Sequence, residues 1–221
     1  SQGGLVDMRI RFDEQLKQLN KEMINMGTMI EKSIGDAVKA LMKQDVELAQ
    51  KVMAGDEEID RTERKIEDLC LRLLLQQQPV ARDLRNISAA LKMVTDMERI
   101  GDHATDISEL AIVLSEKTYV KKLDHIEEMA RETMVMLIQS LEAYVEKDLD
   151  KAQKVIAHDD VIDDLFEEVK QELIELIRNH ADEGEQAVDL LMVTKYFERI
   201  GDHATNIAEW VIFSITGQIA G

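Results

Sequence analysis

The sequence contains few residues that would interrupt a helix or cross-link the chain. It has one proline, one cysteine and only 4% aromatic residues. The single cysteine, Cys70, excludes a disulfide framework within one chain, and its leucine neighbours predict a buried thiol. In a chain of 221 residues, so little proline and so few aromatic side chains favour long unbroken helices over sheets.

Positive charge and long apolar runs are also scarce. The chain has 45 acidic against 27 basic residues and a formal charge of −18, which repels phosphate backbones and anionic lipids, so nucleic-acid binding is not expected. Metal cations, basic patches on partner proteins or simple solubility would explain such a surface.

The longest apolar runs, such as 110–114, fall far short of the roughly 20 residues that span a bilayer. With no apolar signal segment at the start, we expect a cytoplasmic protein that does not insert into membranes.

An internal repeat divides the chain into two halves. Residues 98–105, Glu-Arg-Ile-Gly-Asp-His-Ala-Thr, recur without change at 198–205, an offset of 100. Further upstream the halves match at an offset of 103, so that Asp45 corresponds to Asp148. The three-residue difference falls where a turn is expected, and the chain therefore consists of two copies of one unit.

Apolar residues recur at helical spacing through nearly every segment, and strand-like alternation is absent. Asp45 and Asp148 are good N-cap residues at matching positions, and Pro79 stands near a helix start. At about 1.5 Å per residue the longer helices extend roughly 50 Å, and the short connections make neighbours antiparallel. The pattern predicts helices at 8–43, 46–77, 80–116, 121–146, 149–180 and 185–216.

The predicted fold is all-α, with two tandem homologous three-helix bundles packed side by side. The expected domains are residues 5–117 and 121–216. The linker at 117–122 contains neither glycine nor proline and is compatible with partly helical structure. A linker this short favours one body with the two bundles in contact.

Acidic side chains form rows on two neighbouring helices of each half. On a helical wheel, Glu98, Asp102 and Asp106 fall within a stripe about 80° wide that points away from the apolar face. If the chain folds back at Pro79, residues at equal distances from this turn lie at the same height, and a corresponding turn does the same in the second half. The resulting level pairs are Asp56 with Asp102 and Asp60 with Glu98, and then Asp159 with Asp202 and Asp163 with Glu198.

Four carboxylates at one height would repel one another unless a cation or basic side chains offset their charge. Oxygen ligands suit Mg²⁺, Ca²⁺, Mn²⁺ or iron, and they also accept Zn²⁺. The alternative is that these acids form the solvated outer face of amphipathic helices. His103 and His203 point about 100° away from the preceding aspartates, so packing or a hydrogen bond is expected for them rather than metal ligation.

Three features of the sequence together resemble one known family. They are Gln-Pro-Val-Ala-Arg-Asp-Leu-Arg at 78–85 and the two copies of Glu-Arg-Ile-Gly-Asp at 98–102 and 198–202, in a duplicated three-helix frame. Through these features the sequence resembles the PhoU family, regulators of bacterial phosphate uptake. The resemblance extends over nearly the whole chain. The resemblance implies that an Asp or Glu followed four residues later by Asp binds multinuclear metal clusters, as in some members. With Asp106 added, the implied metal ligands are Asp56, Asp60, Glu98, Asp102, Asp106, Asp159, Asp163, Glu198 and Asp202.

The resemblance implies iron as the first metal to expect, with zinc, manganese and magnesium as alternatives. Asn206 stands where the first copy has Asp106, so the two sites are expected to differ in charge. The implied function is an adaptor between the ATPase subunit of the phosphate ABC transporter and a phosphate-sensing histidine kinase, without catalysis and as a homodimer. The sequence shows no nucleophile elbow or phosphate-binding loop. There are two alternatives. One is a carboxylate-bridged multinuclear metal protein with storage or hydrolase activity, and the other is a purely structural bundle.

Overall fold

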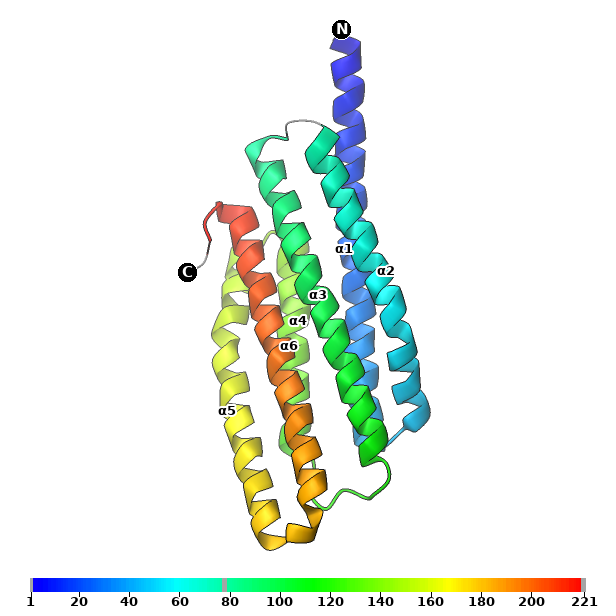
Figure 1. Ribbon diagram of the computed structural model, residues 1–221. Coiled ribbons are helices and arrows are strands. Elements are labelled where there is room, and N and C mark those ends of the chain that lie inside the picture. Colours follow the sequence, from blue (N-terminus) through cyan, green and yellow to red (C-terminus); the bar gives the residue numbers. More distant parts are fainter. Residues whose placement is uncertain (1, 77–78, 220–221) are drawn as a thin grey trace.

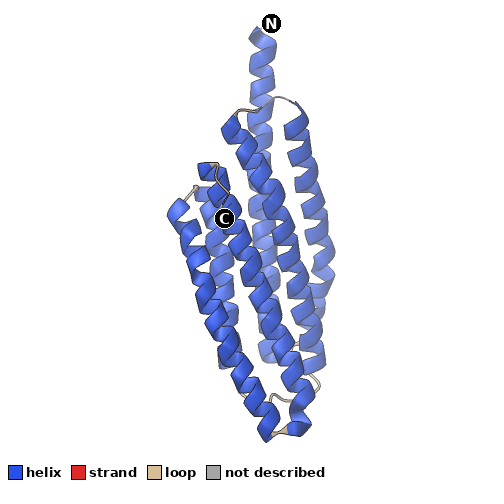
Figure 2. Ribbon diagram, turned by 60° about the vertical axis from the view of Figure 1, so that its left-hand side comes forward, coloured by secondary structure: helices blue, strands red, loops and turns tan. Residues whose placement is uncertain are grey.

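The structure is a computed structural model that describes residues 2–76 and 79–219, and within these residues it contains helices and no strand (Figure 2). Three helices form each half, and the two halves lie side by side (Figure 1). The predicted all-α fold of two three-helix repeats is therefore confirmed. The helices are α1 (Gln2–Lys43), α2 (Val46–Gln76), α3 (Ala81–Leu114), α4 (Asp124–Glu146), α5 (Leu149–Asn179), the short 3-10 helix η1 (Ala181–Glu183) and α6 (Gly184–Thr216).

The second helix of each repeat begins at the predicted aspartate cap. The Asp45 carboxylate accepts a hydrogen bond from the Leu48 backbone N–H at 3.0 Å. At the equivalent position, Asp148 accepts from the Lys151 backbone N–H at the same distance. Each cap satisfies one of the amides that a helix start leaves without an intrahelical partner.

Three helix boundaries differ from the prediction by more than one residue. The first helix begins at Gln2 instead of 8, and its first turns extend beyond the other helices (Figure 1). These turns make few tertiary contacts, so the apolar periodicity that reports a buried face is weak there. Residue 77, predicted as helical, lies outside the described residues.

The other two boundaries flank the connection between the repeats. The third helix ends at Leu114 instead of 116 and the fourth begins at Asp124 instead of 121, so the linker is not helical. The physical reason is a side-chain cap, because the Gln44 amide donates to the carbonyls of Leu114 and Lys117 at 2.8 and 2.7 Å. The cap satisfies carbonyls that the end of a helix leaves without an intrahelical partner, so no further turn of α3 is needed to satisfy them.

The helices α3 and α6 lie side by side at the centre of the molecule and run in opposite directions (Figure 1). Ile100 and Ile200, equivalent residues of the repeated motif, are both fully buried. His103 stacks on its equivalent His203, with 5.6 Å between ring centroids. Contact between equivalent residues of antiparallel helices indicates that an approximate two-fold axis relates the repeats near this point.

Gly101 allows α2 and α3 to approach closely beside the acidic rows. A Cβ at this position would lie 3.2 Å from two atoms of the Ile59 side chain. The equivalent Gly201 is less crowded, since its nearest neighbour, on Ile162, would be 3.6 Å away. The first repeat thus needs glycine here more than the second does.

No helix within the described residues is long and apolar enough to cross a membrane.

Candidate functional site

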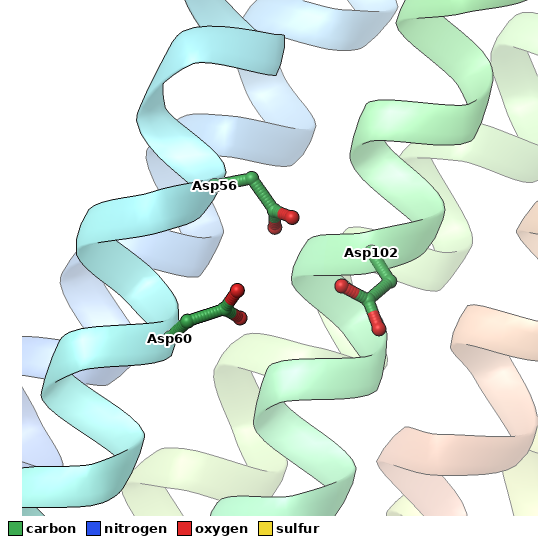
Figure 3. A group of neighbouring side chains, drawn as sticks. All are labelled: Asp56, Asp60 and Asp102. Atoms are coloured by element: carbon green, nitrogen blue, oxygen red, sulfur yellow. The ribbon is translucent and has the colours of Figure 1, made fainter.

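Three aspartates meet where α2 faces α3. Asp56 and Asp60 lie one turn apart on α2 and point toward α3, and Asp102 points back toward them (Figure 3). One carboxylate oxygen from each residue lies within 4.8 Å of the others. All three side chains are half-buried. The folded hairpin therefore brings together three of the four carboxylates that the turn geometry places at one level in the first half.

The arrangement leaves negative charge without compensation. Oδ1 of Asp56 and Oδ1 of Asp60 are buried and have no hydrogen-bond partner among the described residues. None of the ion pairs that the described residues form involves these aspartates or Asp102. Buried carboxylate oxygens without donors are costly unless a cation coordinates them. The residues present therefore fit a hard metal ion bound by oxygen ligands.

Two glutamates, Glu63 on α2 and Glu98 on α3, extend the cluster. Burial raises the pKa of Glu98 to about 8, with a hydrogen bond to Asp102 and repulsion from Asp102, Glu63 and Asp60 adding to the effect. Burial also raises the pKa of Glu63 to about 7, with repulsion from Glu67 and Asp60 as further causes. Glu63 was absent from the predicted metal ligands, although it lies in the same stripe of α2 as Asp60 on a helical wheel.

Asp56 shows the same signature of crowded negative charge. Burial raises its pKa to about 6, and repulsion from Asp102, Asp60 and Asp106 contributes. Asp106 is not a member of the group of three, and its carboxylate lies 3.2 Å from Nδ1 of His103. The structure thus places Asp106 at the edge of the cluster.

The histidines pack and form hydrogen bonds, as the wheel predicts. His103 stacks on Tyr196 as well as on His203, and its ring nitrogen faces Asp106. Nδ1 of His203 lies 2.9 Å from the Asp96 carboxylate of the opposite repeat. The ring stacking and the His203–Asp96 contact connect α3 to α6, and neither histidine belongs to the group of three aspartates.

The second half repeats the residues but not the geometry. No comparable group of three is formed by Asp159, Asp163 and Asp202 within the part of the chain that the structure describes. Asp163 and Asp202 are exposed, and Glu198 accepts a hydrogen bond from Lys195 Nζ at 2.5 Å. Only Asp159 resembles its counterpart Asp56: its Oδ1 is buried without a partner among the described residues, and burial with repulsion from Asp163 and Asp202 raises its pKa to about 6.

Metal-free protein is expected to lose stability as the pH rises from about 5 to about 8. The pKa values of Glu63 and Glu98 are raised to about 7 and about 8 from 4.5, so the folded state binds these protons more tightly than the unfolded state. The stabilisation that this tighter proton binding gives the folded state is complete below the pKa of the glutamates in the unfolded state. It disappears as the pH passes their pKa values in the folded state. Urea unfolding in chelator across this range measures the effect. Glu63→Gln with Glu98→Gln should flatten the profile, whereas wild-type stability that rises with pH would contradict this assignment.

Comparison with known protein families gives a match in both halves of the chain. The PhoU domain family matches residues 23–111 and again 126–211. A protein of Clostridium acetobutylicum, named phosphate-specific transport system accessory protein PhoU homolog, is 40% identical over 208 residues, 94% of this chain and 95% of its own length. A protein of the same name from Caulobacter vibrioides strain NA1000 is 37% identical and covers 94% of this chain and 90% of its own length.

Solved structures agree with the sequence comparisons. The crystal structure of PhoU from Pseudomonas aeruginosa matches with a TM-score of 0.91 and 33% identity, covering 94% of this chain and all of the other. The crystal structure of the phosphate transport system regulatory protein PhoU from Streptococcus pneumoniae matches with a TM-score of 0.87 and 26% identity, covering 95% and 99% of the two chains. The similarity therefore extends over the whole two-repeat fold.

Proposed function

The chain belongs to the PhoU family of phosphate transport accessory and regulatory proteins, and we propose that it is a cytoplasmic regulator of phosphate uptake and phosphate-starvation signalling. It acts as an adaptor that contacts the ATPase subunit of the phosphate ABC transporter and a phosphate-sensing histidine kinase. The observation that supports this most is the group of Asp56, Asp60 and Asp102 where α2 faces α3. Such a site shapes a charged surface for partners.

The proposal includes a metal centre in the first repeat. Asp56, Asp60, Asp102 and Glu98 would hold the metal, with iron as the first candidate and zinc, manganese or magnesium as alternatives. A bound cation supplies positive charge that offsets the mutual repulsion of these carboxylates and ties α2 to α3. The second-repeat site, formed by Asp159, Asp163, Glu198 and Asp202, binds more weakly, because Lys195 already engages Glu198 and two of its aspartates are exposed.

Catalysis is not part of the proposed function. A hydrolase or a metal store would use the same carboxylates to activate water or hold iron. The nearest histidine to the group, His103, is engaged with Asp106 and stacked on Tyr196, so it is not placed to assist such chemistry. Phosphatase or ferroxidase turnover by pure metal-loaded protein, abolished by Asp102→Asn, would replace the adaptor with this alternative.

The adaptor role is tested by binding to the two proposed partners. We expect the ATPase subunit and the cytoplasmic part of the kinase each to bind the wild-type chain immobilised on a biosensor, more weakly at high salt because the surface is acidic. Chelation should weaken binding if the metal shapes the contact surface. Glu98→Gln with Asp102→Asn should act as chelation does. The matched control is Glu198→Gln with Asp202→Asn, which removes the same charge from the second repeat. Failure of both partners to bind the metal-loaded wild type would refute the adaptor role.

We also expect a homodimer. Leu5, Val6, Met8 and Ile10 are exposed near the start of α1, and the first turns of this helix extend beyond the other helices (Figure 1). Exposed apolar side chains that are close together in the sequence are unfavourable in water, and they favour contact with another apolar surface. Sedimentation equilibrium of the wild-type chain measures the association, and a monomer at micromolar concentrations would contradict it.

A further inference from the structure

A basic cavity lies at one end of the molecule, where the start of α3 meets α1 and the ends of α4 and α6. Its volume is about 360 Å³, within the range of about 300–1,000 Å³ that is typical of small-molecule sites. Arg82, Arg85 and Lys147 line it, together with one acid, Asp83. That carboxylate already accepts a hydrogen bond from Arg9 at 3.1 Å. Three cations therefore share one cavity in a chain with a net charge of −18.

These cations have no acidic partner among the residues that the structure describes. Nε of Arg85 is buried without a hydrogen-bond partner among the described residues. Nζ of Lys147 donates to the neutral amide oxygen of Asn86 at 2.6 Å and lies 4.3 Å from the centre of the Tyr144 ring. Burial lowers the pKa of Lys147 to about 8, as expected for an ammonium group without a carboxylate beside it. A buried guanidinium donor without an acceptor is likewise unfavourable unless a ligand supplies one.

The backbone of Lys147 is also unusual. It caps α4 with a φ of 55°, in the left-handed region where glycine is the common choice. The equivalent residue of the first repeat, Gln44, has a φ of 54°, and its side chain donates to the carbonyls of Leu114 and Lys117. The same backbone position thus carries a neutral structural amide in one repeat and a cation that lines a cavity in the other.

The approximate two-fold axis supplies an internal comparison. A second, smaller cavity of about 80 Å³ lies at the opposite end, where the start of α6 meets the end of α3. At the offset of 100, Asp182 replaces Arg82 and Glu185 replaces Arg85 in its lining. The duplicated fold therefore places a cavity at both ends, and the charge of the two cavities is opposite. Helix packing alone does not require a basic lining at either end.

We propose that the basic cavity binds a phosphate-class oxyanion, either free phosphate or the phosphate group of a small metabolite. Guanidinium groups of Arg82 and Arg85 offer paired donors that match the oxygens of such an anion. The start of α3 adds free backbone amides and the positive end of the helix, since Val80 provides no side-chain cap. At about 1.5 Å per residue, Arg85 and Asp102 are roughly 25 Å apart along α3. The anion site is therefore separate from the metal centre and does not depend on it.

Calorimetric titration of the full chain tests the proposal. Chelator-treated protein is titrated at constant ionic strength with inorganic phosphate and, in a second arm, with ATP, which removes metal-bound phosphate as a source of heat. We expect one anion per chain, and Arg85→Gln or Arg82→Gln should weaken binding by at least about tenfold. The control is Lys117→Gln, which removes the same charge beside the acidic cavity and should leave the affinity within about twofold. The probe that binds more tightly identifies free phosphate or a phosphorylated metabolite as the ligand.

Two results would overturn the proposal. One is the absence of binding of either probe to the wild type at millimolar concentrations. The other is wild-type binding that neither arginine substitution weakens, or that all three substitutions weaken equally, because the anion would then respond to net charge rather than to the cavity. Arg85 on α3 is half-buried and packs against Gly217 at the end of α6, so Arg85→Gln could also lower stability. Arg82 is exposed, so Arg82→Gln keeps the test valid in that case. Far-ultraviolet circular dichroism confirms that each variant is folded.

Discussion

Glu98→Gln combined with Asp102→Asn is expected to weaken metal binding by the first repeat by at least about a hundredfold while leaving the helices folded. The two substitutions replace two carboxylates of the site by neutral amides, which bind cations more weakly, but keep the size of both side chains. The fold should persist because these side chains lie between helices at the surface and not in the core. Metal content by elemental analysis and melting by circular dichroism measure the two effects on protein purified without chelator.

The matched variant for this prediction is Glu198→Gln with Asp202→Asn in the second repeat. It removes the same groups from a site where no three carboxylates converge, within the residues that the structure describes. We therefore expect a smaller loss of metal from this variant. Equal loss from both variants would show that metal binding follows total charge and not the geometry of the first-repeat carboxylates.

Ile100→Asp is expected to unfold the first repeat. Ile100 has no exposed surface and lies in the centre of the core, two residues from Glu98 and Asp102 on the opposite face of α3. A carboxylate placed there has no partner, and such a substitution costs about 4 kcal/mol or more, a large part of the roughly 5–15 kcal/mol that stabilises a domain. Differential scanning calorimetry should show the loss or a marked lowering of the transition.

The control for this second prediction is Val113→Asp on the same helix. Val113 is 51% exposed, so an acid at this position remains in water. Its melting temperature should stay close to that of the wild type. Similar destabilisation by Ile100→Asp and Val113→Asp would contradict the structure, in which Ile100 lies on the buried face of α3 and Val113 on the exposed face.

Much of the fold follows from local rules that the sequence displays directly. The repeated segment at 98–105 and 198–205 reveals the duplication, and helical periodicity reveals which faces are buried. The aspartates at 45 and 148 cap helices because a short acceptor before an apolar run satisfies the first free amides. Equal distances from the turn at Pro79 place Asp56 opposite Asp102, since antiparallel helices rise by the same amount per residue.

Other features depend on contacts that a repeat pattern does not encode. The two acidic rows have nearly the same residues, yet only the first forms a group of three among the described residues. In the second row Lys195 engages Glu198. Gly101 and Gly201 are identical in sequence but differ in how closely the facing helix approaches. The glutamine cap at 44 ends α3 through a contact between residues 70 positions apart, which no local pattern indicates.

The central claim is that the group of Asp56, Asp60 and Asp102, where α2 faces α3, is a metal centre. An anomalous difference map from crystals of protein purified without chelator, recorded at the absorption edge of the metal found by elemental analysis, tests it most directly. The account predicts density within coordination distance of carboxylate oxygens of Asp56, Asp60 and Asp102, about 2.0–2.6 Å for oxygen ligands. A fully metal-loaded sample whose anomalous density lies elsewhere, with these three carboxylates bound only to water, would contradict it.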